Sequence, residues 1–241
     1  MIDPGLSAAF EATWPAAEYA RFGGIVIGRG AGGGGRVSSG RAVSPDWTAG
    51  DLDAAVGQAR AWRQPPMFRA PDDDERLIAA LRDMGYVRTM PTFVMHIDAA
   101  KLTGTELPRL TAFAIWPPLA VQRDIWSAEN ISAGRQAVMD RVADPHCAIL
   151  GRIEDRAAGA GFLAAHEGVA MLHALEIRPE YRRKGLAEWM VRFAAQWAVK
   201  NGASRLALAV SRGNAPAVAL YRKMGFAEAG EYAYWQPAPQ P

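Results

Sequence analysis

A short motif occurs twice in this chain. Residues 81–86 read LRDMGY and residues 221–226 read YRKMGF, and their shared glycines are 140 positions apart. Each copy ends an amphipathic helix pattern and precedes a strand pattern, and its glycine stands where a helix terminus favours a left-handed residue. The repeat therefore predicts two copies of one folding unit. Only the second copy begins with a tyrosine, because Leu81 stands where the second copy has Tyr221.

The chain is long enough for both units. Its 241 residues suit two modest domains, and half of them are apolar, as in ordinary globular proteins. Residues 98–108 are polar, contain a glycine and end in a proline, which is typical of a linker. We expect a truncated first unit over residues 1–100 and a complete second unit over residues 108–241.

Charge and cysteine content exclude several classes of protein. The 27 Lys and Arg residues oppose 25 Asp and Glu residues, and the net charge of +2 is too balanced to predict a nucleic-acid partner. Cys147 is the single cysteine, so no intrachain disulfide forms and a reducing compartment is favoured. No apolar stretch approaches the length of a membrane span, and the N-terminus lacks a signal-peptide pattern. The sequence therefore predicts a cytoplasmic protein with neither a nucleic-acid nor a membrane partner.

Helix and strand patterns alternate along the first unit. In order they are a helix over 6–20 interrupted at Pro15, a strand over 24–28, a strand over 36–43, a helix over 51–63, a strand over 67–70, a helix over 74–84 and a strand over 86–97. The glycine-rich run 29–36 favours a flexible connection, and because a strand pattern follows it, it is not predicted to bind phosphate. Pro91 predicts that the last strand lies at a sheet edge or contains a bulge.

The second unit has a longer pattern of helices and strands. It comprises a strand over 110–116, helices over 117–128 and 130–143, strands over 146–153, 158–166 and 169–177, a helix over 185–200, a strand over 206–210, a helix over 214–224 and a strand over 226–235. The three consecutive strands are most simply an antiparallel meander. The predicted fold class is α/β (α+β), with a mixed, mostly antiparallel central sheet that is flanked by helices and duplicated along the chain.

The segment after the meander favours a bound anion. The third strand ends at Ile177, and a helix begins near Gly185. Between them lies a basic turn that contains Arg182, Arg183 and Lys184. The first N–H groups of a helix have no intrahelical partner, and the helix dipole adds positive potential at the same end. Because Gly185 also lets a pyrophosphate approach the backbone, the order of strand, turn and helix predicts a phosphate-binding loop and not merely a solvated basic turn.

A second motif lies in the last helix. Asn214 and Tyr221 are seven positions apart, which is two helical turns, so they share a helix face. By itself Tyr221 would be interpreted as a core aromatic residue. Downstream of a phosphate loop, however, its phenol is a candidate proton donor to a thiolate leaving group.

In combination the two motifs resemble those of the GNAT superfamily, the N-acyltransferases that use acetyl-CoA. The resemblance covers about residues 110–236. The R-x-x-G-x-A pyrophosphate loop of the family corresponds to Arg182, Gly185 and Ala187, and the strand whose backbone pairs with the pantetheine arm corresponds to residues 175–177. The resemblance implies cofactor contacts by Leu175, Ile177, Arg182, Arg183, Lys184, Gly185, Leu186, Ala187, Asn214 and Tyr221.

The resemblance implies an N-acetyltransferase in which residues 108–241 form the catalytic domain. The acetyl group would pass from acetyl-CoA, a co-substrate, to the primary amine of a small molecule by direct attack in a ternary complex, without a metal. A backbone N–H near Ile177 would polarise the thioester carbonyl. Cys147 lies in an inner strand pattern and is predicted to belong to the core and not to act as a nucleophile. The protein is expected to be a monomer or a homodimer.

The first unit resembles a degenerate copy of the same fold. With a shift of 140 positions, the glycine of the phosphate loop falls on Pro45, which has no N–H for a phosphate. The asparagine of the second motif falls on Asp74, beside two more aspartates that would repel a phosphate-rich cofactor. The tyrosine falls on Leu81, which has no proton to give. Residues 1–100 are therefore predicted to be structural or to form a wall of the acceptor pocket.

Two residues compete for the role of general base. Glu176 and His173 lie on the strand beside the expected thioester, and strand alternation predicts that they point to opposite faces. His173 would then share its face with Leu175 and Ile177. Glu176 is favoured, because a carboxylate in so apolar a strand is expensive unless it has a function or pairs with an arginine. Tyr221 is the predicted general acid.

Three other functions fit the same residues. The chain could bind acyl-CoA as a sensor without turnover, and a broad panel of amines would then remain unmodified. It could acetylate a protein N-terminus or a lysine, for which an open groove wide enough for a peptide is expected. It could also be a helix-rich interaction module built on its tryptophans, although most of these lie at apolar helical spacing and are predicted core residues.

Overall fold

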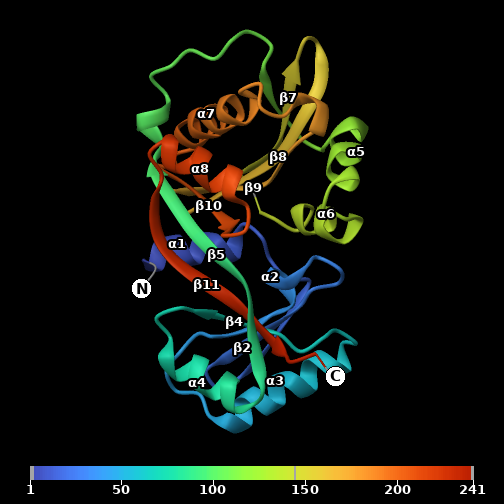
Figure 1. Cartoon of the computed structure of the whole chain (residues 1–241), viewed down its shortest axis with the longest axis vertical. Coiled ribbons are helices and arrows are strands. Elements are labelled where there is room, and N and C mark those ends of the chain that lie inside the picture. The colour runs from blue at the N-terminus through green and yellow to red at the C-terminus, as the bar shows by residue number, and fades with distance from the viewer. Residues whose placement is uncertain (1–2, 144, 240–241) are drawn as a thin grey trace.

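The structure is a computed structural model that describes residues 3–143 and 145–239 (Figure 1). The strands of its first half are β1 (Glu18–Phe22), β2 (Ile25–Arg29), β3 (Gly40–Ala42), β4 (Phe68–Pro71) and β5 (Tyr86–Asp98). The helices of this half are α1 (Pro4–Ala12), α2 (Gly35–Ser38), α3 (Ala49–Ala61) and α4 (Glu75–Asp83), and the 3-10 helix η1 (Ala99–Leu102) follows β5.

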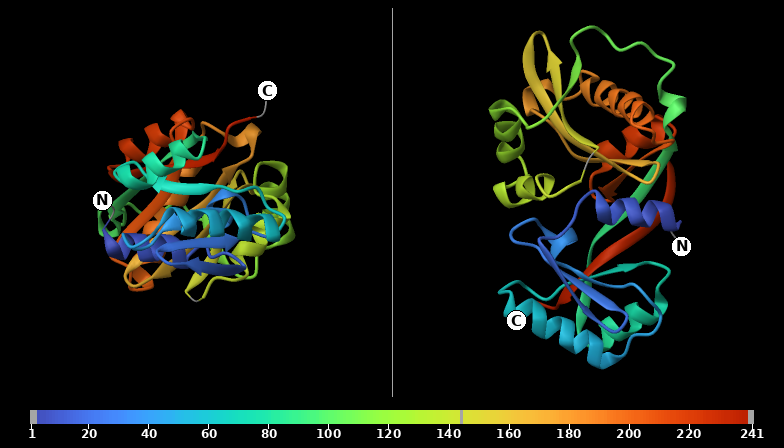
Figure 2. Two further views of the ribbon diagram at one scale, coloured as in Figure 1. Left: turned by 90° about the horizontal axis from the view of Figure 1, so that it is seen from below. Right: turned by 180° about the vertical axis from the view of Figure 1, so that it is seen from behind.

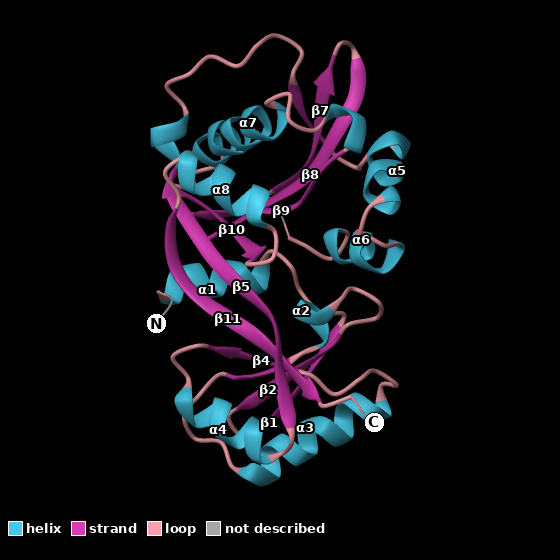
Figure 3. Cartoon of the chain, in the orientation of Figure 1, coloured by secondary structure: helices cyan, strands magenta, loops and turns pink. Residues whose placement is uncertain are grey.

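The second half has the same kinds of element. Its strands are β6 (Ala112–Ile115), β7 (His146–Ile153), β8 (Arg156–His166), β9 (Val169–Ile177), β10 (Arg205–Ser211) and β11 (Ala227–Pro237). Its helices are α5 (Ala120–Ala128), α6 (Ala133–Met139), the 3-10 helix η2 (Pro179–Tyr181), α7 (Leu186–Lys200) and α8 (Ala215–Lys223). Figure 3 shows these helices flanking the strands, which confirms the predicted fold class.

Within the described residues, eleven strands form one sheet in the order β1-β2-β3-β4-β11-β5-β10-β9-β8-β7-β6. Strands β7 to β9 form the predicted antiparallel meander, and β6 extends it by pairing with β7. The pairs β3–β4 and β9–β10 are parallel, and the other described pairs are antiparallel. Both parallel pairs are short. Beyond the last paired residues, the two strands of each pair are no longer hydrogen-bonded to each other, which leaves an opening in the sheet at two places.

The two copies of the repeated motif fold alike. Helices α4 and α8 have the same length, and their first residues are 140 positions apart. Asp74 and Asn214 cap these helices in the same way, because Asp74 accepts a hydrogen bond from the Leu77 N–H at 3.1 Å and Asn214 accepts one from the Ala217 N–H at 3.3 Å. Gly85 and Gly225 both have a positive φ, at 77° and 91°. A glycine avoids the steric cost of that conformation, which explains why both copies keep it.

The last strand of each half continues the sheet of the other half. Strand β5 pairs with β10, and β11 pairs with β4, so β5 and β11 run side by side between the halves (Figure 1). The registers are related by the same 140-residue shift, because Ser211 pairs with Thr92 whereas Pro71 pairs with Tyr232. Thr92 also pairs directly with Tyr232 at the centre. The halves are therefore related by a pseudo-two-fold axis through that pair, and the boundary in the sequence does not divide the sheet.

Helices cover both faces of the second half. Helices α7 and α8 bury Met190, Val191 and Tyr221 against one face, together with Ile149 of β7. Helices α5 and α6 bury other apolar side chains against the opposite face, around Phe162 of β8. Helix α1 crosses the junction of the two halves and packs on strands from both, as the rear view in Figure 2 shows. Among the described residues, no helix has the length and apolarity that a membrane crossing requires.

Two predicted elements of the first half are wrong. The predicted helix over 6–20 ends at Ala12, and residues 18–22 form strand β1, because Pro15 cannot continue the helix. The predicted strand over 36–43 begins instead in the short helix α2, which starts within the glycine-rich run, and only Gly40–Ala42 is strand. In this conformation Val37 is buried in the core cluster of α5 and α6. That contact belongs to the other half, so the local pattern did not indicate it.

The proline of β5 marks a bulge and not a sheet edge. Strand β5 lies between β11 and β10 in the middle of the sheet. Met90 has a φ of 45°, and the pairing with β11 shifts in register beside it. The bulge places Pro91 where no ladder hydrogen bond is needed from its nitrogen, which is how a central strand tolerates a proline.

Candidate active site

The candidate site lies where the second half of the sheet opens. Strands β9 and β10 pair from Val169 and Arg205 to Leu172 and Leu208, and the pairing ends there. Strand β9 continues alone on that side to Ile177. We call this opening the catalytic fork. The free backbone edge of β9 beyond Leu172 includes residues 175–177, the segment to which the family resemblance assigns the pairing with the pantetheine arm.

The predicted phosphate loop follows β9 directly. Gly185 is the N-cap of α7 and has a φ of 83°, and Arg183 also has a left-handed φ of 64°. The Trp189 N–H donates to the Gly185 carbonyl at 3.3 Å, so the N–H groups of Leu186, Ala187 and Glu188 precede the hydrogen-bond ladder of the helix. These N–H groups and the helix dipole favour an anion at this turn. A Cβ on Gly185 would meet no atom within 4 Å, so the glycine is required for its backbone conformation.

Arg182 connects the loop to α5. Its Nη2 lies 2.9 Å from Glu129 Oε2, and its Nε donates to the Ile177 carbonyl at 2.9 Å. Glu129 is the C-cap residue of α5. The structure therefore places this predicted phosphate ligand in an ion pair at the end of β9, where it orders the loop. The side chain is half-exposed, so it remains at the loop surface.

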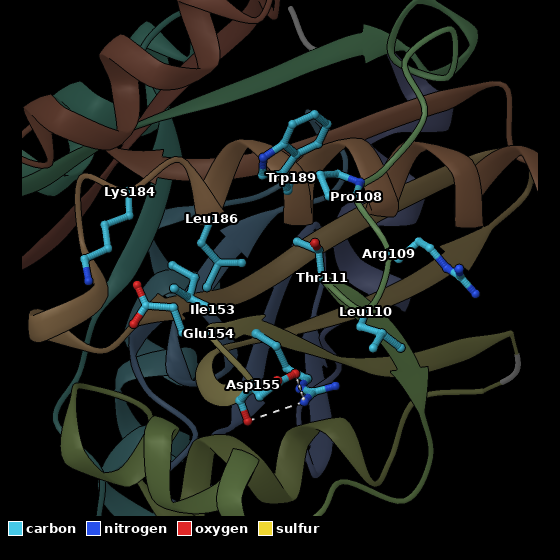
Figure 4. Close-up of a pocket in the computed structure, with 11 residues that line it drawn as sticks. Pro108, Arg109, Leu110, Thr111, Ile153, Glu154, Asp155, Lys184, Leu186 and Trp189 are labelled. Carbon is cyan, nitrogen blue, oxygen red and sulfur yellow. Dashed lines mark hydrogen bonds and ion pairs between the residues drawn. The ribbon is translucent and has the colours of Figure 1, made fainter.

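The other basic residues of the loop are exposed. Lys184 Nζ lies 5.3 Å from the centre of the Tyr181 ring. Lys184, Leu186 and Trp189 also line an open pocket of about 390 Å³ beneath the linker, which Figure 4 shows. Arg183 is exposed as well. The loop therefore presents two lysine or arginine side chains to solvent in addition to its backbone N–H groups.

Tyr221 lies on α8 and is buried in the core cluster of α7 and α8. Its ring centre is 5.6 Å from that of Phe226. Burial raises the pKa of Tyr221, and the nearby carboxylate of Glu176 raises it further. The phenol is therefore protonated at neutral pH, as a general acid requires. Asn214, the other residue of this motif, uses its side chain to cap α8.

A bulge in β9 changes the predicted orientation of the two base candidates. Ala174 has a φ of 49°, and the β8–β9 register shifts at this point. His173 pairs with Phe162 and Glu176 pairs with Ala160. Ala160 and Phe162 are two positions apart and share a face, so their partners share it too. The prediction that His173 and Glu176 point to opposite faces is therefore wrong, because the extra residue of a bulge reverses the alternation.

The same bulge leaves Leu175 and Ile177 on the other face. Both pack against the core cluster that contains Tyr221. His173, which was predicted to share their face, instead stacks with Phe162 at 6.2 Å between ring centres. Glu176 thus lies on the α5–α6 face of β9, whereas Tyr221 approaches from the α7–α8 face. An acid and a base on opposite sides of the catalytic fork suit a group transfer that takes place between them.

His173 connects the two halves. Its Nδ1 lies 3.3 Å from Arg36 Nη1, and its Nε2 lies 2.9 Å from Thr13 Oγ1. A guanidinium can only donate, so Nδ1 accepts; the Thr13 hydroxyl donates to the Ala9 carbonyl at 2.7 Å, so it accepts the proton of Nε2. Burial lowers the pKa of His173 well below its ordinary value, and Arg36 lowers it further. The ring is therefore a neutral histidine with both nitrogens occupied.

Glu176 lies among charges from α5 and α6. Burial raises the pKa of this half-buried carboxyl group, and Glu129 raises it further, while Arg182 and Arg135 oppose them. Glu129 and Arg135 were not predicted, because one is a helix C-cap residue and the other a helix surface residue, and neither belongs to a motif. Glu176 is thus a half-buried carboxyl group with a raised pKa on the α5–α6 side of β9.

Cys147 belongs to the core, as predicted. It is 5% exposed, and burial raises the pKa of its thiol to about 12. A thiol with so high a pKa is a poor nucleophile at neutral pH. Within the described residues, no group of three or more His, Cys, Asp or Glu side chains is placed to hold a metal ion.

The chain is similar to several proteins of known sequence. It is 28% identical over 123 residues to the "Uncharacterized N-acetyltransferase YobR" of Bacillus subtilis, which covers 50% of this chain and 49% of that protein. It is 27% identical over 193 residues to the mycothiol acetyltransferase of Clavibacter michiganensis, which covers 74% of this chain and 63% of that protein. The chain therefore spans about half to just under two thirds of the length of these relatives.

Solved structures share the fold across almost the whole chain. A GCN5-related N-acetyltransferase from Kribbella flavida matches with a TM-score of 0.69 and 16% identity over 98% of this chain and 92% of that chain. A tandem GNAT protein from the clavulanic acid biosynthesis pathway matches with a TM-score of 0.62 and 13% identity over 84% of this chain and 76% of that chain. The profile of the Acetyltransferase (GNAT) family matches residues 106–226, which is half of the chain. The chain therefore belongs to the GNAT family of acetyltransferases, the acyltransferases that use acetyl-CoA.

Proposed function

We propose that this protein is an N-acetyltransferase that moves an acetyl group from acetyl-CoA to the primary amine of a small molecule. The observation that carries the proposal is the placement of a protonated Tyr221 and a carboxylate of raised pKa, Glu176, on opposite sides of one catalytic fork. The turn at Gly185 lies beside that fork and favours a pyrophosphate. These are the parts that a direct transfer between a thioester and an amine needs.

The proposed reaction is a single addition and elimination in a ternary complex. Glu176 removes a proton from the ammonium form of the acceptor on the α5–α6 side, and the neutral amine attacks the thioester carbon. The carbonyl oxygen becomes an oxyanion, which a backbone N–H near Ile177 stabilises. The C–S bond then breaks, and the thiolate takes the proton of Tyr221 on the α7–α8 side. The nitrogen loses its remaining extra proton to solvent, the Tyr221 phenolate takes a proton from solvent, and Glu176 releases its proton to water. The neutral amide and free CoA then leave, and no metal takes part.

The arrangement of the halves favours a small acceptor. Residues of the first half cover the α5–α6 side of the catalytic fork: Trp14 lies 5.1 Å from His173 between ring centres, and Arg36 contacts the same histidine. A Cβ on Gly134 of α6 would come within 2.5 Å of the Gly32 carbonyl, so the glycine-rich loop packs tightly on α6. We propose that residues 1–100 are a degenerate GNAT-like domain that narrows the acceptor side, and that residues 108–241 are the catalytic domain.

A mass-resolved acetylation screen tests the function. The full chain is incubated with acetyl-CoA and, in separate libraries, with small amines, peptides with free N-termini and lysine-containing peptides. We expect a mass increase of one acetyl group in a small amine and none in the peptides. Acetylated peptides alone would identify a protein N-acetyltransferase, and binding of acetyl-CoA with no product in any library would identify a sensor.

The pH dependence of kcat/KM tests the general base. A carboxylate acts as a base only when it is deprotonated, so activity should be present above the pKa of Glu176 and fall as the pH falls through it. The pH profile of the wild type should therefore have an acidic limb, over which kcat/KM falls as the pH falls. Because burial raises the pKa of Glu176, this limb should lie above the ordinary pH range of a glutamate. Glu176→Gln should lose the limb. His173→Gln should keep it, because both nitrogens of that ring are already bonded to Arg36 and Thr13. A limb that survives in Glu176→Gln would show that another group or water takes the proton.

A further inference from the structure

The first half of the sheet has an opening that matches the catalytic fork. Strands β3 and β4 pair in parallel at Gly40 and Phe68, and the pairing ends there. The last pair of the catalytic fork is Leu172 with Leu208, and Phe68 and Leu208 are 140 positions apart. We call the opening beyond Gly40 the first-half fork. The next residue of each strand after this pair is an arginine, Arg41 on β3 and Arg69 on β4.

A cavity of about 110 Å³ lies at the first-half fork. It is lined by Arg41 and Arg69 from the two strands, by Phe10 and Glu11 from α1, and by Tyr232 from β11. Ser7, an exposed residue of α1, lies at its rim. Pockets for drug-sized ligands occupy about 300–1,000 Å³, so this cavity suits only a small molecule.

The cavity wall carries more positive than negative charge. Glu11 forms ion pairs with Arg69 and with Arg41, the latter at 3.2 Å. Arg36 does not line the cavity, but it also faces Glu11 and stacks over the Phe10 ring at 3.4 Å from its centre. The carboxylates on adjacent elements have other partners, because Asp3 pairs with Arg205 and Asp72 pairs with Arg88. Three guanidinium groups therefore face one carboxylate.

Part of this positive charge lacks a hydrogen-bond acceptor. Arg69 is 6% exposed, and its Nη1 has no hydrogen-bond partner among the described residues. The same holds for Nε of Arg36 within the described chain. Burial lowers the pKa of Arg36 to about 10, which reflects how poorly the buried charge is solvated. A buried cation without a full set of acceptors is costly, so a second anion beside Glu11 would stabilise the cluster.

We propose that the cavity at the first-half fork binds a small carboxylate with a short apolar chain. A carboxylate matches the planar donor geometry of Arg41 and Arg69. The apolar chain would pack on Phe10, Val94 and Ala42, which line the same cavity. The site differs from the proposed acetyl-CoA site in its place in the fold and in its ligand, and α1 forms part of its wall. It does not depend on the proposed acetyl transfer.

Titration calorimetry at constant ionic strength with chloride as the background anion tests this proposal. Acetate, butyrate and inorganic phosphate are titrated separately into the full chain. We expect saturable binding of one carboxylate per chain, with butyrate tighter than acetate because its chain buries more apolar surface. Tighter binding of phosphate than of either carboxylate, or no saturable binding of a carboxylate, would overturn the assignment.

Two variants locate the binding in the cavity. Arg41→Gln removes one guanidinium group from the cavity and should weaken butyrate binding about tenfold or more. Ser7→Leu adds a larger side chain at the rim of the cavity, from an exposed helical position and without a change of charge, and it should abolish butyrate binding. This second variant keeps the test decisive if Arg41→Gln does not fold. Arg29→Gln is the matched control, because Arg29 also pairs with a glutamate but lies on β2 away from the cavity. Equal binding by all three variants and the wild type would exclude this cavity.

One further variant distinguishes carboxylate binding at the first-half fork from binding at the catalytic fork. Gly185→Glu changes the catalytic fork only, so it should bind butyrate like the wild type. Loss of butyrate binding in that variant would place the carboxylate in the catalytic fork and refute the proposal. Two acetyl-CoA molecules per wild-type chain would likewise refute it, because the cofactor would then occupy the first-half fork.

Discussion

Replacement of Tyr221 by Phe is expected to lower kcat by about 10²–10⁴-fold, the usual contribution of a positioned general acid. The phenol is buried on the opposite side of the catalytic fork from Glu176, and both burial and the charge of that carboxylate raise its pKa, so it holds its proton at neutral pH. Phenylalanine keeps the ring and its contact with Phe226 but removes the proton. The affinity for acetyl-CoA should therefore change little. Steady-state kinetics and calorimetry on the same preparation measure the two quantities separately.

Tyr181→Phe is the matched control for this change. Tyr181 lies on η2 beside the phosphate loop, and its ring contacts Lys184. The substitution removes a hydroxyl beside the proposed phosphate loop and should leave kcat close to the wild-type value. If Tyr221→Phe were as active as Tyr181→Phe, the thiolate would be leaving without a proton from this residue.

Replacement of Gly185 by Glu is expected to abolish measurable binding of acetyl-CoA. Gly185 has a φ of 83°, a conformation that costs an L-residue about 1–2 kcal/mol. The new carboxylate would stand at the N-terminus of α7, where the backbone N–H groups favour a phosphate, and would repel it. Because the space around a Cβ at this position is open, the chain should still fold. Calorimetric titration with acetyl-CoA measures the loss.

Gly202→Glu provides the control at the other end of the same helix. Gly202 has a φ of 78°, and a Cβ there also meets no atom within 4 Å, so the backbone strain and the added charge are matched. This variant should bind acetyl-CoA like the wild type.

The affinity of Arg182→Ala for acetyl-CoA should lie between those of Gly185→Glu and Gly202→Glu. We expect a loss of about 1–2 kcal/mol in binding free energy, because one charged hydrogen-bond donor is lost while the backbone N–H groups remain. Normal affinity in Gly185→Glu would disprove the phosphate-loop assignment.

The local motifs were well predicted from the sequence. Helices α4 and α8 end two residues before the glycines of the repeated motif, and their N-termini are capped by the residues that the pattern indicated. Strands β7 and β9 have the predicted bounds. Hydrophobic periodicity, caps and glycines act within a few residues of chain, so a single sequence carries their signal.

The orientation of the two base candidates was not predicted from the sequence. Strand alternation assigned His173 and Glu176 to opposite faces, and the bulge at Ala174 placed them on the same face. A bulge depends on the register between two strands, and no residue in this apolar strand indicates its position. The structure also paired His173 with Thr13 and Arg36, which lie more than 130 positions away in the chain.

The sequence by itself determined the two copies of the folding unit, the glycine turn at the start of α7 and the tyrosine on α8, because each of these depends on residues close together in the chain. Only the tertiary structure decided how the copies combine. The exchange of β5 and β11 between the halves and the contacts of α1 and α2 with β9 arise from the packing of apolar faces that are distant in sequence. Such packing is decided by which surfaces can be buried together, and local patterns do not encode that choice.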